Sequence, residues 1–421
     1  MVRRRVLPPV LLLAAVTAAA WWGVGGFHSA GAAPALSEGE IRNLDIAFYR
    51  RRAERDPQGA ADRAQLAGLY QQRGRETGNL EDFRRAEGAA RASLARRDFR
   101  NGKARLTLAS SLLAQHRFVE ALEAARLLCA LEPDEVAYRA LVGEIELELG
   151  RYEEAGRTFR ALAGAWRNLA VAPRLARWAE IRGRTPEARY ILGAARDEAM
   201  RRPHLPREQV AWFHLRVADL ELRNGRLANA ERALRDGLAA APDDYRLLAA
   251  RARLELARRR WTHTIRYGER AVRLRPDLAT LALLADAYRA RGDSAQAEQY
   301  FAAVERFARE NPEPFNRVWT GFLLDHDRRL PETLALLRQE IRVRQDVYGY
   351  DQLAWAAHKT GDAVTADAAI RAALRMGTRD AVVSYHAGMI ARARGDTAAA
   401  EQYLAAALSI NPTSTLSPLA P

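Results

Sequence analysis

The chain of 421 residues contains a single cysteine, Cys129, so no disulfide within the chain can hold its fold together. The cysteine lies in the apolar stretch 125–131, which has helical spacing, and we expect a buried, unreactive thiol there. One cysteine also excludes the structural zinc sites that need several thiolate ligands. Side-chain packing must therefore provide the stability of the fold.

The sequence also lacks the patterns that mark most enzymes. None of its eight histidines belongs to a His-Glu-x-x-His pattern, and neither a Gly-x-Ser-x-Gly nor a P-loop pattern occurs. The tightest grouping of acids with a histidine is Asp325, His326 and Asp327. It lies in a predicted turn between helices, where capping by aspartate is favoured over metal binding. We therefore expect no catalytic residues, no cofactor and no metal, and we predict that the protein is not an enzyme.

The N-terminal segment 1–33 differs in composition from the rest of the chain. Arg3, Arg4 and Arg5 precede the apolar run 6–22, and a small-residue site for cleavage follows at residues 30–32. This order of a basic and an apolar region is typical of an export signal. A buried first helix is the alternative, but Pro8, Pro9 and the following glycines disfavour it.

The N-terminal segment could be either removed after export or kept as a membrane anchor. The apolar run has about 17 residues, at the short limit for crossing a membrane, so a cleaved signal and an uncleaved anchor are both possible. No cysteine comes directly after the run, which excludes a lipoprotein anchor. In either case we expect the rest of the chain to be periplasmic or extracellular, and we expect membrane contact only through the N-terminal segment, if it stays attached.

Lysine is nearly absent, because Lys103 and Lys359 are the only two and all other basic side chains are arginines. The formal net charge is +14, and many arginines alternate with glutamates at helical spacing. A basic surface outside the cytoplasm favours anionic partners, such as an acidic protein or an anionic envelope polymer. Nucleic acid is the alternative partner of a basic chain, and we do not expect it, because export separates the chain from most nucleic acid.

Two segments near the C-terminus, 288–301 and 391–404, almost repeat each other. The pairs Gly361-Asp362 and Gly395-Asp396 lie 34 residues apart, and small residues recur at the same offset. Each repeat holds two blocks rich in helix-forming residues, such as 382–393 and 398–409. The glycine between them suits a left-handed helix end, and Asp396 or Thr397 can cap the next helix. A fixed period of this kind predicts an array of helix pairs.

Small residues also recur within each repeat. Two helices approach to about 8–10 Å only where small side chains occupy the crossing. The eighth position holds Gly143, Gly388, Ala67, Ala109, Ala218, Ala285 and Ala354, and the twentieth holds Ala86, Ala121, Ala155, Ala188, Ala230, Ala297, Ala366 and Ala400. Prolines 133, 242, 276 and 412 close four units.

With this length, these small residues and these prolines, the unit resembles a tetratricopeptide repeat. The resemblance covers nearly the whole chain, and it implies an all-α fold: a right-handed α-solenoid of stacked antiparallel helix pairs. Stretches such as 350–356 and 384–391 also resemble the closing repeats of exported bacterial tetratricopeptide proteins of unassigned role. The resemblance implies binding of protein partners and adds no chemistry.

This template divides the chain into four parts: a signal or anchor at 1–33, a linker and capping helix at 34–59, an array at 60–414, and a disordered tail at 415–421. Units begin near residues 60, 102, 136, 169, 211, 245, 278, 313, 347 and 381, which makes about ten helix pairs. The unit at 313–346 is degenerate and its register is open. In the capping helix, Ile41, Leu44 and Phe48 form an apolar stripe that could cover the open end of the array.

In this family the first helix of each unit lines the concave side, where ligands usually bind. The two last units offer the most distinctive inward positions, and aromatic, methionine and arginine side chains there suit a peptide or an acidic tail. The peptide-groove candidates are Tyr348, Asp351, Trp355, His358, Tyr385, Met389 and Arg392. Packing between repeats is the competing interpretation for Trp355 and Tyr385. The units before them offer more polar inward positions, including Asp219, Arg223, Arg253, Asp286 and Arg289.

Two functions follow as hypotheses. The first is a non-enzymatic protein–protein interaction scaffold in the cell envelope or outside the cell, which binds partner segments in its concave groove. The second is a structural assembly or anchoring component of an envelope polysaccharide or secretion apparatus. One subgroup of the family clamps terminal carboxylates with lysines and asparagines, and the inward positions of this chain do not match that pattern.

Overall fold

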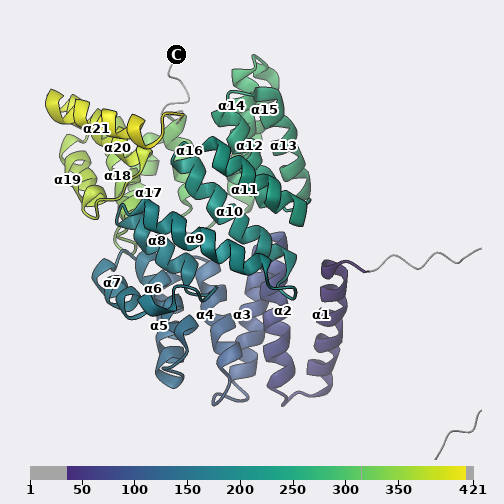
Figure 1. The fold of residues 1–421 in the computed structure, drawn as a ribbon. Helices are drawn as coiled ribbons and strands as arrows, with labels where there is room; N and C mark the ends of the chain where they lie inside the picture. Colours follow the sequence, from purple (N-terminus) through teal and green to yellow (C-terminus); the bar gives the residue numbers. More distant parts are fainter. Residues whose placement is uncertain (1–35, 314, 414–421) are drawn as a thin grey trace, which may run out of the picture. The chain divides into compact units, whose positions relative to one another are not determined.

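The computed structural model describes residues 36–313 and 315–413, and the N-terminal segment 1–33 and the tail 415–421 considered above lie outside them. In the described part, the chain forms α-helices and no strand (Figure 1). The helices are α1 (Glu38–Arg55), α2 (Ala61–Thr77), α3 (Leu80–Leu94), α4 (Gly102–Ala114), α5 (Phe118–Leu131), α6 (Val136–Glu148), α7 (Tyr152–Ala161), α8 (Ala172–Ile181), α9 (Thr185–Met200), α10 (Arg207–Arg223), α11 (Leu227–Ala240), α12 (Tyr245–Ala257), α13 (Trp261–Leu274), α14 (Leu278–Ala290), α15 (Ser294–Glu310), α16 (Arg317–Asp325), α17 (Leu330–Glu340), α18 (Val347–Lys359), α19 (Ala363–Leu374), α20 (Ala381–Ala393) and α21 (Thr397–Ile410).

From α2 onward the helices stack as antiparallel pairs, from α2–α3 to α20–α21, in a right-handed α-solenoid. The first helices begin at residues 61, 102, 136, 172, 207, 245, 278, 317, 347 and 381. These starts differ from the expected ones by three or four residues at 172, 207 and 317, where the repeat pattern is weakest. First helices of successive pairs touch each other, as α2 touches α4 and α18 touches α20, which places the first helices on the inner side of the curve.

The small residues of the repeat lie where the helices cross. Ala67, Ala109, Ala218, Ala285 and Ala354 in the first helices are fully buried. A Cβ atom added to Gly388 would come within 2.7 Å of Leu404 Cγ in the second helix of its pair. The small side chains therefore set how closely two helices of a pair approach.

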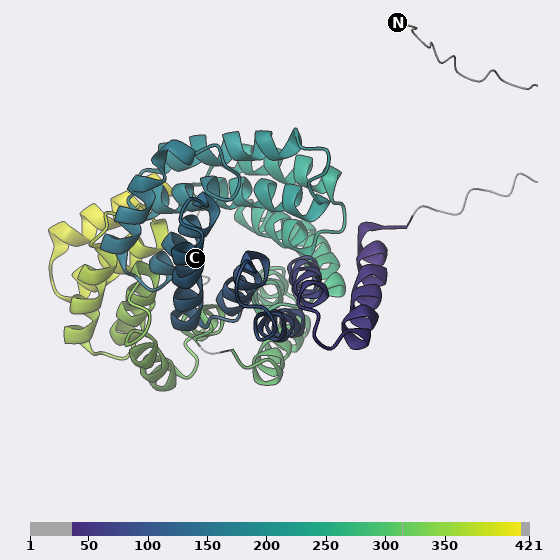
Figure 2. The ribbon, with the colours of Figure 1, turned by 90° about the horizontal axis from the view of Figure 1, so that it is seen from below.

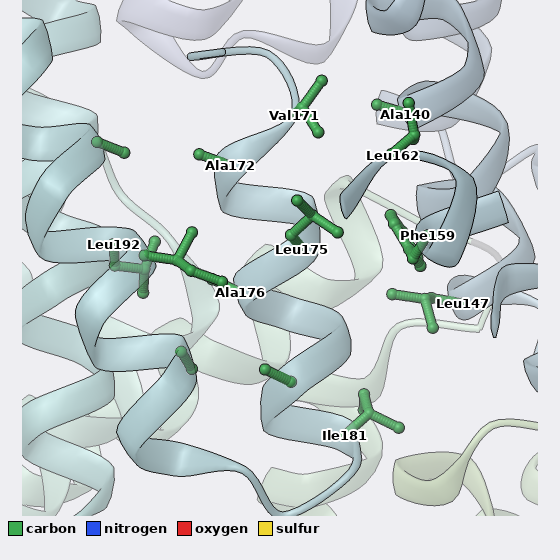
Figure 3. Close-up of a cluster of buried hydrophobic side chains, with 14 of the residues drawn as sticks. Ala140, Leu147, Phe159, Leu162, Val171, Ala172, Leu175, Ala176, Ile181 and Leu192 are labelled. Atoms are coloured by element: carbon green, nitrogen blue, oxygen red, sulfur yellow. The ribbon is translucent and has the colours of Figure 1, made fainter. Parts of the chain in front are cut away.

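The apolar core is divided along the stack into several clusters, as expected when each unit packs mainly on its neighbours. Figure 3 shows the largest, to which α7 contributes Phe159, α8 contributes Leu175 and α9 contributes Leu192. Cys129 packs at the edge of another cluster and is half-buried, not fully buried as expected, because it sits near the C-terminal end of α5.

The turns of three late pairs share one chemical pattern. Gly395 adopts a left-handed conformation with φ of 81° and ends α20, and the Asp396 side chain accepts a hydrogen bond from the Ala399 N–H to begin α21. Asp293 and Asp362 cap α15 and α19 in the same way. The expected glycine turn with an aspartate cap is therefore present at Gly395 and Asp396.

The later pairs return to the earlier ones, so that turns within early pairs contact loops between late pairs (Figure 2). The Gln345 N–H donates to the Leu149 carbonyl at 3.1 Å, and the Val347 N–H donates to the Tyr152 hydroxyl, 195 residues away, at 2.8 Å. The Thr378 hydroxyl donates to the Ile181 carbonyl at 2.5 Å. We call this row of contacts the seam.

The seam continues to the end of the described chain. The Asn411 side-chain amide donates to the Leu222 carbonyl at 3.2 Å. Arg344 pairs with Glu148, and its guanidinium lies 4.6 Å from the centre of the Phe118 ring. Val347, which begins α18, is fully buried in the cluster formed by α6 to α10. The seam therefore joins the two halves of the solenoid with hydrogen bonds, charge pairs and apolar packing.

Helix α1 lies against α2, but the predicted apolar stripe does not form the contact. Ile41, Leu44 and Phe48 are 47%, 59% and 47% exposed, whereas Arg42 is buried and pairs with Glu76. The covering role that we expected for this stripe is therefore wrong. The side chains that α1 buries are Arg42, Ile46 and Ala53, so the contact uses a face of α1 next to the predicted stripe. Among the described helices, none is both long and apolar enough to cross a bilayer.

Candidate functional site

The predicted groove residues of α18 and α20 fall into one cluster and three separate positions. Trp355 stacks on His386 with ring centroids 4.2 Å apart and on His358 at 5.1 Å. Tyr385 lies 6.0 Å from Trp355, and Asp351 Oδ1 lies 2.9 Å from His386 Nδ1. The structure therefore brings Asp351, Trp355, His358 and Tyr385 together, and it adds His386, which the sequence did not single out.

This aromatic cluster is only partly open to solvent. Asp351 and His386 are buried, while Trp355, His358 and Tyr385 are half-buried. Burial lowers the pKa of His358, and the nearby charges of His386 and Lys359 lower it further, so its ring is neutral near pH 7. The cluster thus serves packing between repeats at its base and offers uncharged ring faces at its surface.

The other predicted residues lie apart from this cluster. Tyr348 faces α8, where the Arg177 guanidinium lies 5.0 Å from the centre of its ring. On α20, Met389 is half-buried and Arg392 is exposed. Of these three residues, only Tyr348 contacts the other half of the solenoid.

The triplet at 325–327 does not cap a helix as expected. Arg329 precedes α17 in a left-handed conformation and provides no side-chain cap. His326 instead binds the Phe322 carbonyl at 2.8 Å and Asp286 at 3.0 Å, and Lys359 pairs with Asp327 at 2.6 Å. The reason is that the chain enters α17 through Arg329, which leaves the aspartates pointing away from the helix start.

A cavity of about 1070 Å³ opens on the inner side of the first half of the solenoid. First helices α2, α4, α6, α8, α10 and α12 contribute to its lining. Its apolar side chains include Phe83, Leu106, Leu147, Trp212 and Phe213. The volume lies at the upper end of the range usual for ligand pockets, which leaves room for an extended segment of chain.

Arginines dominate the charge of this cavity, because seven of them line it with only three glutamates, Glu144, Glu148 and Glu208. The arginines are Arg75, Arg174, Arg177, Arg202, Arg216, Arg246 and Arg275. Some are paired within the cavity, as Arg174 is with Glu144 at 2.7 Å and Arg246 with Glu208 at 2.9 Å. Positive charge remains in excess at the surface that a ligand would meet.

Three arginines share one carboxylate beside this cavity, and two of them, Arg177 and Arg216, line it. The Glu180 side chain is buried on α8, and its oxygens lie 3.8 Å from Arg177 and 3.3 Å from Arg216, and also contact Arg223. Although burial alone would raise it, the pKa of Glu180 is lowered by these guanidiniums. Burial lowers the pKa of Arg216. We call these four residues with Tyr348 the arginine cluster.

The arginine cluster could be found only in part from the sequence. Arg223 was among the inward polar positions expected of its unit, whereas Arg177 and Arg216 were not. Glu180 and Arg177 come from α8, Arg216 and Arg223 from α10, and Tyr348 from α18. The spacing of a single repeat gives no signal for a site that joins three units across the seam.

A family model described as tetratricopeptide repeat matches three segments of the chain, residues 106–170, 215–279 and 352–415. Among curated proteins, no sequence matches the chain. The matched segments contain Arg216, Arg223, Trp355 and Tyr385, whereas Arg177, Glu180 and Tyr348 lie outside them.

Solved structures of repeat proteins resemble the chain at low identity. A tetratricopeptide repeat protein from Parabacteroides merdae is 14% identical over 66% of this chain and 98% of its own, with a TM-score of 0.42. PilF of Pseudomonas aeruginosa is 16% identical over 50% of this chain and 93% of its own, with a TM-score of 0.40. The human IFIT1 dimer with PPP-AAAA is 15% identical over 89% of this chain and 95% of its own, with a TM-score of 0.47.

Proposed function

Because the chain belongs to the tetratricopeptide repeat family, we propose that it is an exported, non-catalytic scaffold that holds a segment of a partner protein against the inner face of its solenoid. The tetratricopeptide repeat fold is one of protein–protein interaction. The observation that carries the proposal is the inner face itself. Half-buried Trp355 and Tyr385 lie on its first helices α18 and α20, and arginines line a large cavity in the first half of the solenoid.

The aromatic cluster supports binding of a peptide rather than a reaction. Trp355 and Tyr385 offer apolar ring faces, and such residues often dominate binding energy at protein interfaces. Because helices on both sides hold them, they lose little entropy when a partner binds. A partner segment laid along α18 and α20 would cover both rings at once.

Affinity capture from the host organism tests this proposal. The double substitution Trp355→Ala and Tyr385→Ala should strongly reduce recovery of the bound partner, with helicity unchanged by circular dichroism. The matched control removes another aromatic pair, Trp166 and Tyr190, whose rings lie 5.4 Å apart away from α18 and α20. Recovery of the same partner by both variants would rule out the aromatic cluster as its site.

The export part of the proposal rests on the basic and apolar order of residues 3–22. A fusion of residues 1–40 to a reporter that is active only outside the cytoplasm should become active, and replacing Arg3, Arg4 and Arg5 with glutamates should abolish the signal. A reporter that stays inactive in the unaltered fusion would place the scaffold inside the cell and contradict this part of the proposal.

A further inference from the structure

We propose that the arginine cluster binds a carboxylate of an acidic partner segment that lies in the cavity of the first half of the solenoid. This inference rests on the proposed scaffold function and names the chemistry of its ligand. Three guanidiniums face one carboxylate in the cluster, which leaves two positive charges unmatched at half-buried side chains. Partly buried charge of one sign is costly unless an ion of opposite sign approaches it.

No other carboxylate of the described chain neutralises this excess directly. Asp219 lies on α10 but pairs with Arg253 at 2.6 Å. Asp380 accepts the Val382 N–H at 2.9 Å and begins α20. Glu148 pairs with Arg344 in the seam. Each acidic group near the cluster is therefore already held by another partner.

The site is built by both halves of the solenoid. Arg177 and Arg216 line the cavity from the first half, while Tyr348 comes from α18 in the second half. The Tyr348 hydroxyl lies 3.4 Å from an Arg177 terminal nitrogen, and its ring covers the guanidinium. This contact fixes the direction of Arg177, so that its remaining N–H groups are available to an incoming oxyanion.

An acidic peptide fits the cavity better than a nucleic acid does. The lining mixes arginines with Phe83, Leu147, Trp212 and Phe213, which suit the apolar side chains of a peptide. Glutamates 144, 148 and 208 also line it, and they would repel a phosphodiester chain that carries a charge at every residue. Glu180 already shows that the guanidiniums here pair with a carboxylate.

Binding of fluorescent peptides to the full chain tests the inference. A peptide of alternating glutamate and leucine should bind, and Arg216→Gln should weaken its affinity about tenfold, as the loss of one charged hydrogen bond predicts. Arg216→Lys should restore part of the affinity. Arg273→Gln, an exposed arginine on α13, should leave the affinity unchanged. Equal weakening by both neutral variants would overturn the inference, because it would indicate unspecific attraction.

Glu180→Gln gives a result that a purely structural role would not produce. Removing the resident carboxylate frees three guanidiniums, so the peptide should bind more tightly than to the unaltered chain, even if the variant melts at a lower temperature. A weaker or unchanged affinity in a variant of normal helicity would overturn the inference.

Competing ligands complete the test. Inorganic phosphate alone or a single-stranded oligonucleotide that binds more tightly than the peptide, with the same loss in Arg216→Gln, would overturn the assignment to an acidic peptide. If the captured partner of the scaffold binds Arg216→Gln normally and is not displaced by the acidic peptide, this site is wrong while the proposed function stands.

Discussion

Glycines end the first helix in pairs at both ends of the solenoid, yet they meet different surroundings. Gly150, Gly183 and Gly225 lie on the seam, where an added Cβ would come within 2.2 Å of the Gln345 carbonyl oxygen at Gly150 and within 2.2 Å of the Gly377 carbonyl oxygen at Gly183. Gly361 and Gly395 in the last pairs would meet no atom within 4 Å. All five have positive φ.

The comparison shows that glycine is needed at these turns for two different reasons. In the last pairs glycine serves only the left-handed backbone, which costs other residues about 1–2 kcal/mol. In the early pairs it also lets another stretch of backbone approach. Where His116 replaces the glycine, with φ of 59°, a cavity of about 690 Å³ lined by His116 and Glu313 lies in the seam. Close contact across the seam thus accompanies glycine, and space accompanies the larger side chain.

The largest expected effect comes from placing a methyl group at each kind of turn. Gly395→Ala should lower the free energy of unfolding by about 1–2 kcal/mol through backbone strain alone. Gly150→Ala should lower it by a further 1–3 kcal/mol or so, because the methyl group overlaps fixed backbone at Gln345. Urea titration of both variants measures the difference. Equal losses would show that the seam is open in solution.

A smaller effect sharpens the comparison by removing one hydrogen bond across the seam. Thr378→Val should cost about 1 kcal/mol, because the Ile181 carbonyl loses the donor that reaches it from the other half. Thr360→Val is the control, since the Thr360 hydroxyl donates to carbonyls of its own helix, at Ala356 and Ala357. Thermal melting compares the two variants, and a larger loss in Thr360→Val would contradict the role given to the seam.

The smallest effect at neutral pH concerns two histidines whose pKa values are shifted in opposite directions. Burial, aided by Arg196, lowers the pKa of His214 on α10. At His326 burial also favours the neutral ring, but the hydrogen bond and charge of Asp286 outweigh it and raise the pKa. The His214 contribution to stability is therefore complete above its unfolded pKa of about 6.5 and is lost as the pH falls through the lower folded value.

The His326 contribution has the opposite sign. It is complete below pH of about 6.5 and is lost as the pH rises through the raised folded value. Melting temperatures of His214→Gln and His326→Gln between pH 5 and 8 test both. The first variant should lose less stability than the unaltered chain on acidification, and the second should lose less as the pH rises from 6.5. The same pH profile in both variants would contradict the assigned shifts.

Much of the solenoid could be predicted because its cause is local. The glycine and aspartate at residues 395–396 end one helix and begin the next, and alanines at fixed offsets mark each crossing. The prediction failed where contact with a neighbouring helix decided the outcome, as at α1, which buries Arg42, Ile46 and Ala53 in place of the predicted stripe.

The residues of the candidate site could likewise be predicted only where their contacts are local. Trp355, His358 and Tyr385 lie on neighbouring first helices, so their grouping follows from the repeat period. Tyr348 has the same kind of position but meets Arg177, 171 residues earlier. The pattern of a single repeat cannot predict a contact between residues so far apart along the chain.

The sequence alone determined the period, the helix pairs, the small side chains at their crossings and the all-α class, since each depends on residues within one unit or its neighbour. Only the tertiary structure decided which early turn meets which late loop, and hence where Arg177, Arg216 and Tyr348 converge. The reason is that the rotation from one pair to the next is small and adds up over several units, so minor differences in packing fix where the two halves meet.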